Sequence, residues 1–264
     1  MDAVQFRGPA GVMAVLLLEI ALGSLAVLVV APVWGVVKRG YFLLVGWSAV
    51  AFALLSFLVA LGPFHRIGQD ADLARHMVFG VVIWSNLTMT LLHVGRFRVA
   101  RALGAVACVV GVAAVLLIAG LRGDGATAVK GVAAMLTGAV FLGATWNGML
   151  LGHWYLVDRK LKNDPMRWHA WAFTAGVALA VVSAALAKGG RPTGSEAGLN
   201  PLLLVSDLTL YLAFGLVAVC ALLAFFVHKL VNEGSIRAAT GMLYLAVIMA
   251  FAAEFAAKAR FFTV

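Results

Sequence analysis

Apolar runs of about twenty residues recur along the whole chain of 264 residues. A run of this length lets an α-helix cross the hydrocarbon core of a bilayer, which is roughly 30 Å thick. The runs are too long and too continuously apolar for the alternating strands of a membrane β-barrel. Because lipid cannot hydrogen-bond the backbone, spanning segments must satisfy it internally. The runs therefore predict transmembrane helices.

Short polar segments separate the runs, and no sizeable soluble domain fits between them. The predicted fold is all-α, a polytopic membrane protein of eight transmembrane helices that forms one integral membrane domain over residues 1–264. The expected spans are 12–37, 41–61, 77–94, 102–121, 131–157, 168–186, 202–227 and 238–257.

Two similar segments raise the question of an internal repeat. His93 is followed by Arg101 and Gly104, and His228 is followed by Arg237 and Gly241. They occupy equivalent places in the order of spans and run in the same direction. This pattern suggests two four-helix bundles divided near residues 122–130, although so few shared residues also fit coincidence.

The composition agrees with a membrane protein. Hydrophobic residues make up 64% of the chain and charged residues 12%, whereas a soluble domain is about half apolar and a quarter charged. The net charge of +9 would suggest nucleic acid in a soluble protein. Here the charges lie in short loops, so the expected partners are the bilayer and other membrane or peripheral subunits, and no nucleic acid.

The loops also indicate an orientation. An even number of spans puts both termini on one side, and the loops of the other side are basic with few acids. Positively charged loops face the cytoplasm, so we expect both termini outside a bacterial inner (plasma) membrane. The segment 144–171 marks the cytoplasmic boundary with its Trp and basic residues. The basic residues of that side are Lys38, Arg39, Arg96, Arg98, Arg101, Arg159, Lys160, Lys162, Arg167, Lys229 and Arg237.

Three carboxylates lie inside apolar runs and are predicted to fall in the outer half of the membrane: Glu19, Asp207 and Glu254. Ionisable side chains are costly in lipid, by roughly 2.5–3.5 kcal/mol at a helix centre, and often mark a functional site. One of the three would serve as a proton acceptor. The structural alternatives are an i,i+4 ion pair of Glu254 with Lys258 and a helix-end role for Asp207. Glu19 has no cation at helical spacing and is the strongest candidate.

A second group of candidates is polar and histidine-rich, at the cytoplasmic ends or middles of spans. His93 and His153 come from different spans at similar depth, as the axial ligands of a membrane haem b must. Asn86, Thr90 and His93 share one helical face, which should turn toward other helices or a cavity. Asn86 and Asn147 would bond neighbouring helices or a quinone carbonyl. The candidate cofactor-binding residues are thus His93, His153, Asn86 and Asn147, with quinone preferred over haem b and no metal site predicted.

In helix number and topology the whole chain resembles the eight-helix membrane anchor subunits of DMSO- and polysulfide-reductase type complexes. The resemblance implies two four-helix bundles, quinol binding without haem and both termini outside. No motif of that family is matched in this sequence, so it carries no site residue across.

The sequence assigns no enzymatic reaction, since GxxxxGK[ST], HExxH and GxSxG are all absent. The first hypothesis is a membrane subunit of a respiratory-type electron-transfer complex that binds quinone or anchors redox partners. The alternatives are a proton- or cation-coupled transporter of small solutes, a non-catalytic scaffold subunit, and a membrane enzyme with its own haem or metal.

Overall fold

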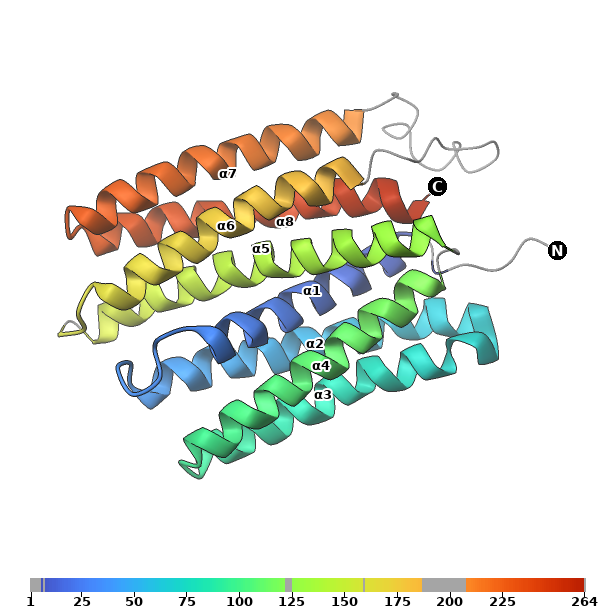
Figure 1. The fold of residues 1–264 in the computed structure, drawn as a ribbon, viewed down its shortest axis with the longest axis horizontal. Coiled ribbons are helices and arrows are strands. Elements are labelled where there is room, and N and C mark those ends of the chain that lie inside the picture. Colours follow the sequence, from blue (N-terminus) through green and yellow to red (C-terminus); the bar gives the residue numbers. More distant parts are fainter. Residues whose placement is uncertain (1–5, 7, 122–124, 159, 187–207, 264) are drawn as a thin grey trace.

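The chain forms a bundle of long, roughly aligned α-helices (Figure 1). The computed structural model describes residues 6, 8–121, 125–158, 160–186 and 208–263, without the side chains of 260–263. Within these residues there is no β-strand. The elements are α1 (Pro9–Val30), α2 (Arg39–Ile67), the short 3₁₀ helix η1 (Gly68–Ala71), α3 (Asp72–His93), α4 (Phe97–Gly120), α5 (Ala126–Val157), α6 (Asp164–Leu186), α7 (Leu208–Asn232) and α8 (Ile236–Thr263).

Seven helical segments of the described chain are long and apolar enough to cross a membrane, rather than the eight predicted. The difference arises because α2, η1 and α3 form one apolar segment of 55 residues, Arg39–His93. The outer surface of the bundle is apolar, with side chains such as Ile83, Val109 and Ile248 exposed. An all-helical integral membrane protein is therefore supported, because such a surface needs lipid around it.

The first helix ends earlier than predicted. The expected span reached residue 37, but α1 ends at Val30 and a loop follows. Pro32 explains the difference, because a proline disfavours helical backbone at the residue before it. The helix begins at Pro9 in the first turn, where a proline is well tolerated. Glu19 consequently lies at the middle of α1, whereas the expected span 12–37 places it about two helical turns from the outer end.

The helix α1 occupies the centre of the bundle. It packs against α2, α4, α5 and α8, and most of its residues are buried. A helix buried on all sides has to be apolar on all sides, and the first run of the sequence has this property. The single charged residue in the run, Glu19, is therefore placed inside the protein and not against lipid.

The contacts within α1–α4 recur within α5–α8. In each set consecutive helices pack on one another, and the first helix also packs on the fourth. Two turns match as well. In one, Arg96 N–H bonds to the Leu91 carbonyl oxygen (2.9 Å), and in the other Ser235 N–H bonds to that of Leu230 (2.8 Å). The glycines Gly95 and Gly234 reverse the chain there with φ of 78° and 76°, in the left-handed region that helix ends often use.

Side-chain hydrogen bonds repeat in the same way. Ser56 Oγ of α2 donates to the Ala14 carbonyl of α1 (2.7 Å), and Ser183 Oγ of α6 donates to the Ala134 carbonyl of α5 (3.2 Å). Counted from the matching turn glycines, however, the partner of His93 is Asn232. The His93–His228 similarity seen in the sequence is thus one helical turn out of register with this pattern.

The two sets of helices meet most closely where α1 crosses α5. A Cβ placed on Gly23 would overlap the Ala139 carbonyl oxygen, and one on Gly143 would overlap the backbone of Gly23. Glycines allow this approach because they have no side chain, and close packing of this kind is a principal source of helix association in lipid.

We expect Gly143→Ala to destabilise the protein by about 1–3 kcal/mol or more, since this is the usual cost of overpacking a well-packed site. The measurement is the denaturation temperature in mild detergent. Gly215→Ala is the control, since a Cβ there meets nothing within 4 Å, and its denaturation temperature should equal or exceed that of the parent. Equal stability of the two variants would contradict the close crossing.

Candidate functional site

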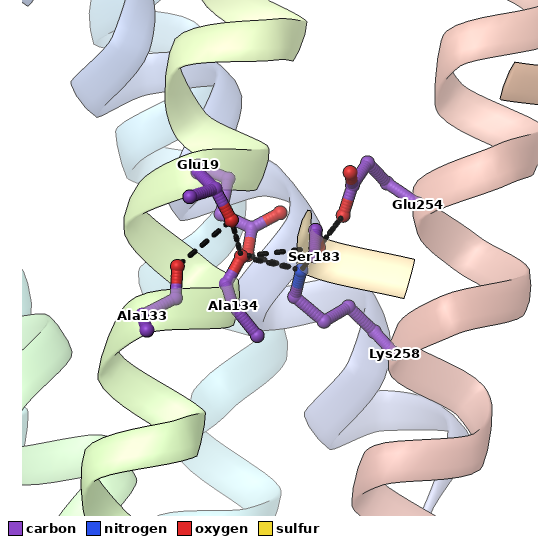
Figure 2. A network of polar contacts seen from close by, with 7 residues as sticks. Glu19, Ala133, Ala134, Ser183, Glu254 and Lys258 are labelled. Carbon is purple, nitrogen blue, oxygen red and sulfur yellow. Dashed lines mark hydrogen bonds and ion pairs between the residues drawn. The ribbon is translucent and has the colours of Figure 1, made fainter. Parts of the chain in front are cut away.

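Three charged side chains meet in the interior between α1, α5, α6 and α8 (Figure 2). Lys258 Nζ lies 2.7 Å from Glu254 Oε2 and 3.1 Å from Glu19 Oε1. The exposed fractions of these side chains are at most 2%. We call Glu19, Glu254 and Lys258 the buried triad. It joins a carboxylate from the first helix of the chain to a carboxylate and an ammonium from the last.

Two neighbours form hydrogen bonds with Lys258 and Glu254. Lys258 Nζ donates to the Ala134 carbonyl oxygen (3.0 Å) and to Ser183 Oγ (3.1 Å). Ser183 has one hydroxyl hydrogen, which it shares between Glu254 Oε2 (3.0 Å) and the Ala134 carbonyl oxygen (3.2 Å). An ammonium has three hydrogens to donate, so Lys258 is fully engaged and fixed in position.

Glu19 is less well satisfied than Glu254. Its Oε1 is ion-paired with Lys258, but neither carboxylate oxygen has a hydrogen bond with good geometry among the described residues. With both carboxylates ionised the triad carries a net charge of −1, enclosed by apolar helices. Unpaired charge is expensive in such an environment, so the geometry provides a place for one further positive charge.

Gly138 of α5 forms the wall of the triad. A Cβ built there would lie 2.7 Å from Glu254 Oε2, 2.9 Å from Glu19 Oε2 and 3.0 Å from Lys258 Nζ. The charged atoms therefore rest directly against the backbone of α5. Substituting any other residue at Gly138 would displace at least one of them.

The predicted acidic candidates have different outcomes. The Glu254–Lys258 pair of α8 is present, as the structural interpretation of the sequence expected. Glu19, which seemed to have no cation, receives the same lysine from α8, because the packing of α1 on α8 supplies what its own helix lacks. Asp207 lies outside the described residues. Ser183 was not identified from the sequence. Gly138 belongs to a glycine-rich face that predicts close helix packing, but nothing in the sequence places it beside charged atoms.

The histidine candidates are not brought together. His93 is exposed and its Nε2 accepts a hydrogen bond from Trp47 Nε1 (3.0 Å). His153 is also exposed and lies with Nδ1 3.1 Å from the Tyr244 hydroxyl. Each pairs with an aromatic residue of a neighbouring helix. Among the described residues no cluster of three or more His, Cys, Asp or Glu could hold a metal ion.

The two asparagine candidates lie in contrasting places. Asn147 is buried, and its Nδ2 donates to the Ser24 carbonyl of α1 (2.9 Å), so it bonds two helices as the structural interpretation expected. Asn86 and Thr90 were predicted to face other helices or a cavity, and that prediction is wrong for the isolated chain. Both are exposed on the outside of α3, because the buried face of α3 is formed by other residues, such as Val81 and Ser85.

An apolar groove lies beside Trp146, between α1, α2, α5 and α8. Its volume is about 390 Å³ and its lining includes Ile20, Phe52, Leu142, Trp146 and Phe251. Trp146 Nε1 already donates to Ser48 Oγ (2.9 Å). The groove therefore offers shape and apolar surface more than hydrogen bonds.

Comparison with family models, curated proteins and solved structures finds no match for this chain.

We expect Lys258→Met to destabilise the protein by about 3–5 kcal/mol, the usual cost of removing one partner of a buried ion pair. The loss is measured from the unfolding midpoint when a denaturing detergent is titrated into protein held in a mild detergent. Neutralising all three residues, as Glu19→Gln, Lys258→Met and Glu254→Gln together, should recover most of that loss, because no uncompensated charge remains.

Lys229→Met is the matched control. Lys229 is exposed near the end of α7, and a surface substitution of this kind changes stability by only about 0.5 kcal/mol. A triple variant less stable than Lys258→Met alone would contradict the ionised triad.

Proposed function

We propose that this chain is a proton-coupled membrane protein, of the kind that transports small solutes, and that the buried triad takes up and releases the coupling proton. The observation that carries the proposal is the arrangement of two carboxylates around one ammonium, all with exposed fractions of at most 2%. The cluster is neutral only when one carboxylate holds a proton. Binding and release of that proton switches the site between two charge states.

A proton suits this site better than a metal cation. Lys258 Nζ already lies between the two carboxylates, in the position that a bound cation would need. A proton needs no such space and adds to a carboxylate oxygen. Glu19 Oε2, which has no hydrogen-bond partner among the described residues, is the favoured acceptor.

The triad is not a requirement of the packing. Glu254 and Lys258 follow the turn glycine Gly234 by 20 and 24 residues, and at the same spacing after Gly95 stand Val115 and Ala119. Both are fully buried in α4. The first set of helices thus packs at the equivalent place with apolar side chains alone. Charges that packing does not need, and that lipid makes costly, support a functional role.

The position of the triad suggests how a proton would act on the protein. Glu19 belongs to α1, whereas Glu254 and Lys258 belong to α8. Protonation of Glu19 removes its charge and weakens the attraction between these two helices. In a transporter such a change shifts the balance between two arrangements of the helices. The close contact of Gly23 with Gly143 is a point about which α1 could tilt relative to α5.

The proposal includes a topology of eight crossings in two four-helix groups, α1–α4 and α5–α8. The segment Arg39–His93 has 55 residues and would be about 80 Å long at 1.5 Å per residue, more than twice the bilayer core. It folds back at η1, and Phe57 and Phe79 then contact across α2 and α3 with ring centroids 5.0 Å apart. It therefore suffices for two crossings.

The start of α1 and the end of α8 lie at the same end of the bundle (Figure 1). The basic turns between α1 and α2, α3 and α4, and α5 and α6 lie at the opposite end. The positive-inside rule then puts both termini outside a bacterial plasma membrane.

Infrared difference spectra recorded across a pH titration test the proton site. We expect a protonated-carboxylic-acid carbonyl band that disappears as pH rises in the parent protein and is missing in Glu19→Gln. Glu233→Gln, the same chemical change on an exposed turn, should leave the band intact. A spectrum with no such band in the parent at any pH at which it stays folded would contradict proton uptake by the triad.

We infer a second candidate function from the apolar groove, that of a quinone-binding membrane subunit of an electron-transfer complex. The volume of about 390 Å³ and the aromatic lining by Phe52 and Trp146 suit a quinone ring or its isoprenoid tail. The exposed Asn86 and His93 of α3 support partner subunits, because a polar side chain on a lipid-facing helix gains a hydrogen bond when another helix covers it. Haem b has no support of this kind.

Quinone extracted from protein purified in mild detergent tests this second function. We expect Val247→Trp, which fills the groove from α8, to reduce bound quinone several-fold. Leu245→Trp is the control, since Leu245 is exposed and does not line the groove. Quinone content that is the same in both variants and in the parent would place any bound quinone elsewhere.

A further inference from the structure

A basic pocket opens at the end of the bundle opposite the start of α1. It has a volume of about 660 Å³ and lies between the loop after α1, the start of α2 and the start of α4. Lys38, Arg39, Arg98 and Arg101 line it over an apolar floor that includes Trp34 and Phe42. No acidic residue is among its lining residues, so the lining is positively charged.

Arg101 is held in position before any ligand arrives. Its Nε donates to the Val29 carbonyl at the end of α1 (2.8 Å), and its guanidinium carbon lies 5.5 Å from the centroid of the Trp34 ring. Trp34 is itself fixed, since its Nε1 donates to the Leu28 carbonyl (2.9 Å). Neither contact uses the two terminal amino groups of Arg101, which are the donors that suit a phosphate.

Two helix N-termini also reach the pocket. α2 begins at Arg39 and α4 at Phe97, and both residues line the pocket. The residues before them, Lys38 and Arg96, make no side-chain cap hydrogen bond. Such N-termini present unpaired N–H groups and the positive end of the helix dipole. Cations and uncapped amides therefore converge on one place, which is the arrangement that binds phosphate groups.

We propose that this pocket binds the phosphate headgroup of an anionic phospholipid. A lipid is favoured over free phosphate because Val36 and Phe97, two apolar residues of the lining, are 54% and 39% exposed. Apolar side chains beside the cations match the boundary between headgroup and acyl chain. Basic pockets between transmembrane helices recur as sites for anionic headgroups.

The four cations are not equivalent. Lys38 Nζ is 3.1 Å from Asp158 Oδ2, so part of its charge is already compensated. Arg39, Arg98 and Arg101 are exposed and carry the main attraction for the headgroup. Substitution of Arg98 and Arg39 removes charge without disturbing the bond from Arg101 to the end of α1.

The test uses the full chain in nanodiscs of phosphatidylcholine with a minor fraction of phosphatidylglycerol. Phosphatidylglycerol retained after transfer to detergent is counted by native mass spectrometry. We expect one tightly held phosphatidylglycerol, and a loss of affinity of about tenfold or more in Arg98→Gln/Arg101→Gln, given the attraction that each basic residue supplies near an anionic lipid. Arg39→Gln/Arg98→Gln should give a similar loss. Because this variant keeps Arg101 and its bond to α1, its loss of affinity cannot come from a folding defect caused by substituting Arg101.

Arg167→Gln/Lys229→Gln is the matched control, because it removes two positive charges from the same end of the bundle outside the pocket. It should retain phosphatidylglycerol like the parent. Equal retention in the parent and both pocket variants would overturn the proposal, since the lipid would then be bound nonspecifically. Complete displacement by inorganic phosphate at low concentration would also overturn it, in favour of a site for free phosphate.

Discussion

The enclosure of three charged side chains in an apolar bundle is the interaction that constrains the rest of this structure. Lys258 reaches both carboxylates only because Gly138 leaves room at the backbone of α5. Glu19 is in reach only because α1 passes through the middle of the bundle, which requires the crossing of Gly23 and Gly143. Ser183 then supplies the remaining hydrogen bond from α6. Helices from both ends of the sequence are thus committed to one position by electrostatics, in a medium where misplacing a charge is costly.

The two sets of helices share their turns and their packing, but they do not share the buried triad. Matching turns at Gly95 and Gly234, and matching hydrogen bonds from Ser56 and Ser183, follow from one packing scheme used for both sets. The triad has no such match, because α8 carries Glu254 and Lys258 where the corresponding positions of α4 hold Val115 and Ala119. Since the fully buried Val115 fills the matching position of α4, the packing alone does not require Glu254 in α8. The asymmetry therefore lies in the contact of α1 with α8, which joins the two sets of helices beside the crossing of α1 and α5.

The sequence was sufficient for properties that depend on one helix at a time. Apolar runs located the helices, and i,i+4 spacing predicted the pair of Glu254 and Lys258. It was insufficient wherever the answer depends on which helix faces which. The cation of Glu19 was missed because Lys258 comes from the last helix, far away in the sequence. Asn86 was predicted to be internal because nothing in its own helix shows which face α2 and α4 cover. The apparent His93–His228 repeat was out of register for a related reason, since residue identity is a poorer guide than the turns that set the packing.

The triad and the basic pocket act on the same helix. Arg101 and Trp34 bind the last carbonyls of α1, at Val29 and Leu28, while Glu19 holds the middle of that helix to α8. The proposed headgroup would neutralise the cations that flank this end and bond to Arg101, which already holds the Val29 carbonyl, and so would restrain α1. Any shift of α1 that follows protonation of Glu19 must then work against that restraint. Linkage is reciprocal: if headgroup binding alters the ease of proton uptake, proton uptake alters headgroup affinity by the same factor. The rigid, apolar α1 between the two sites is the physical element through which this coupling would be carried.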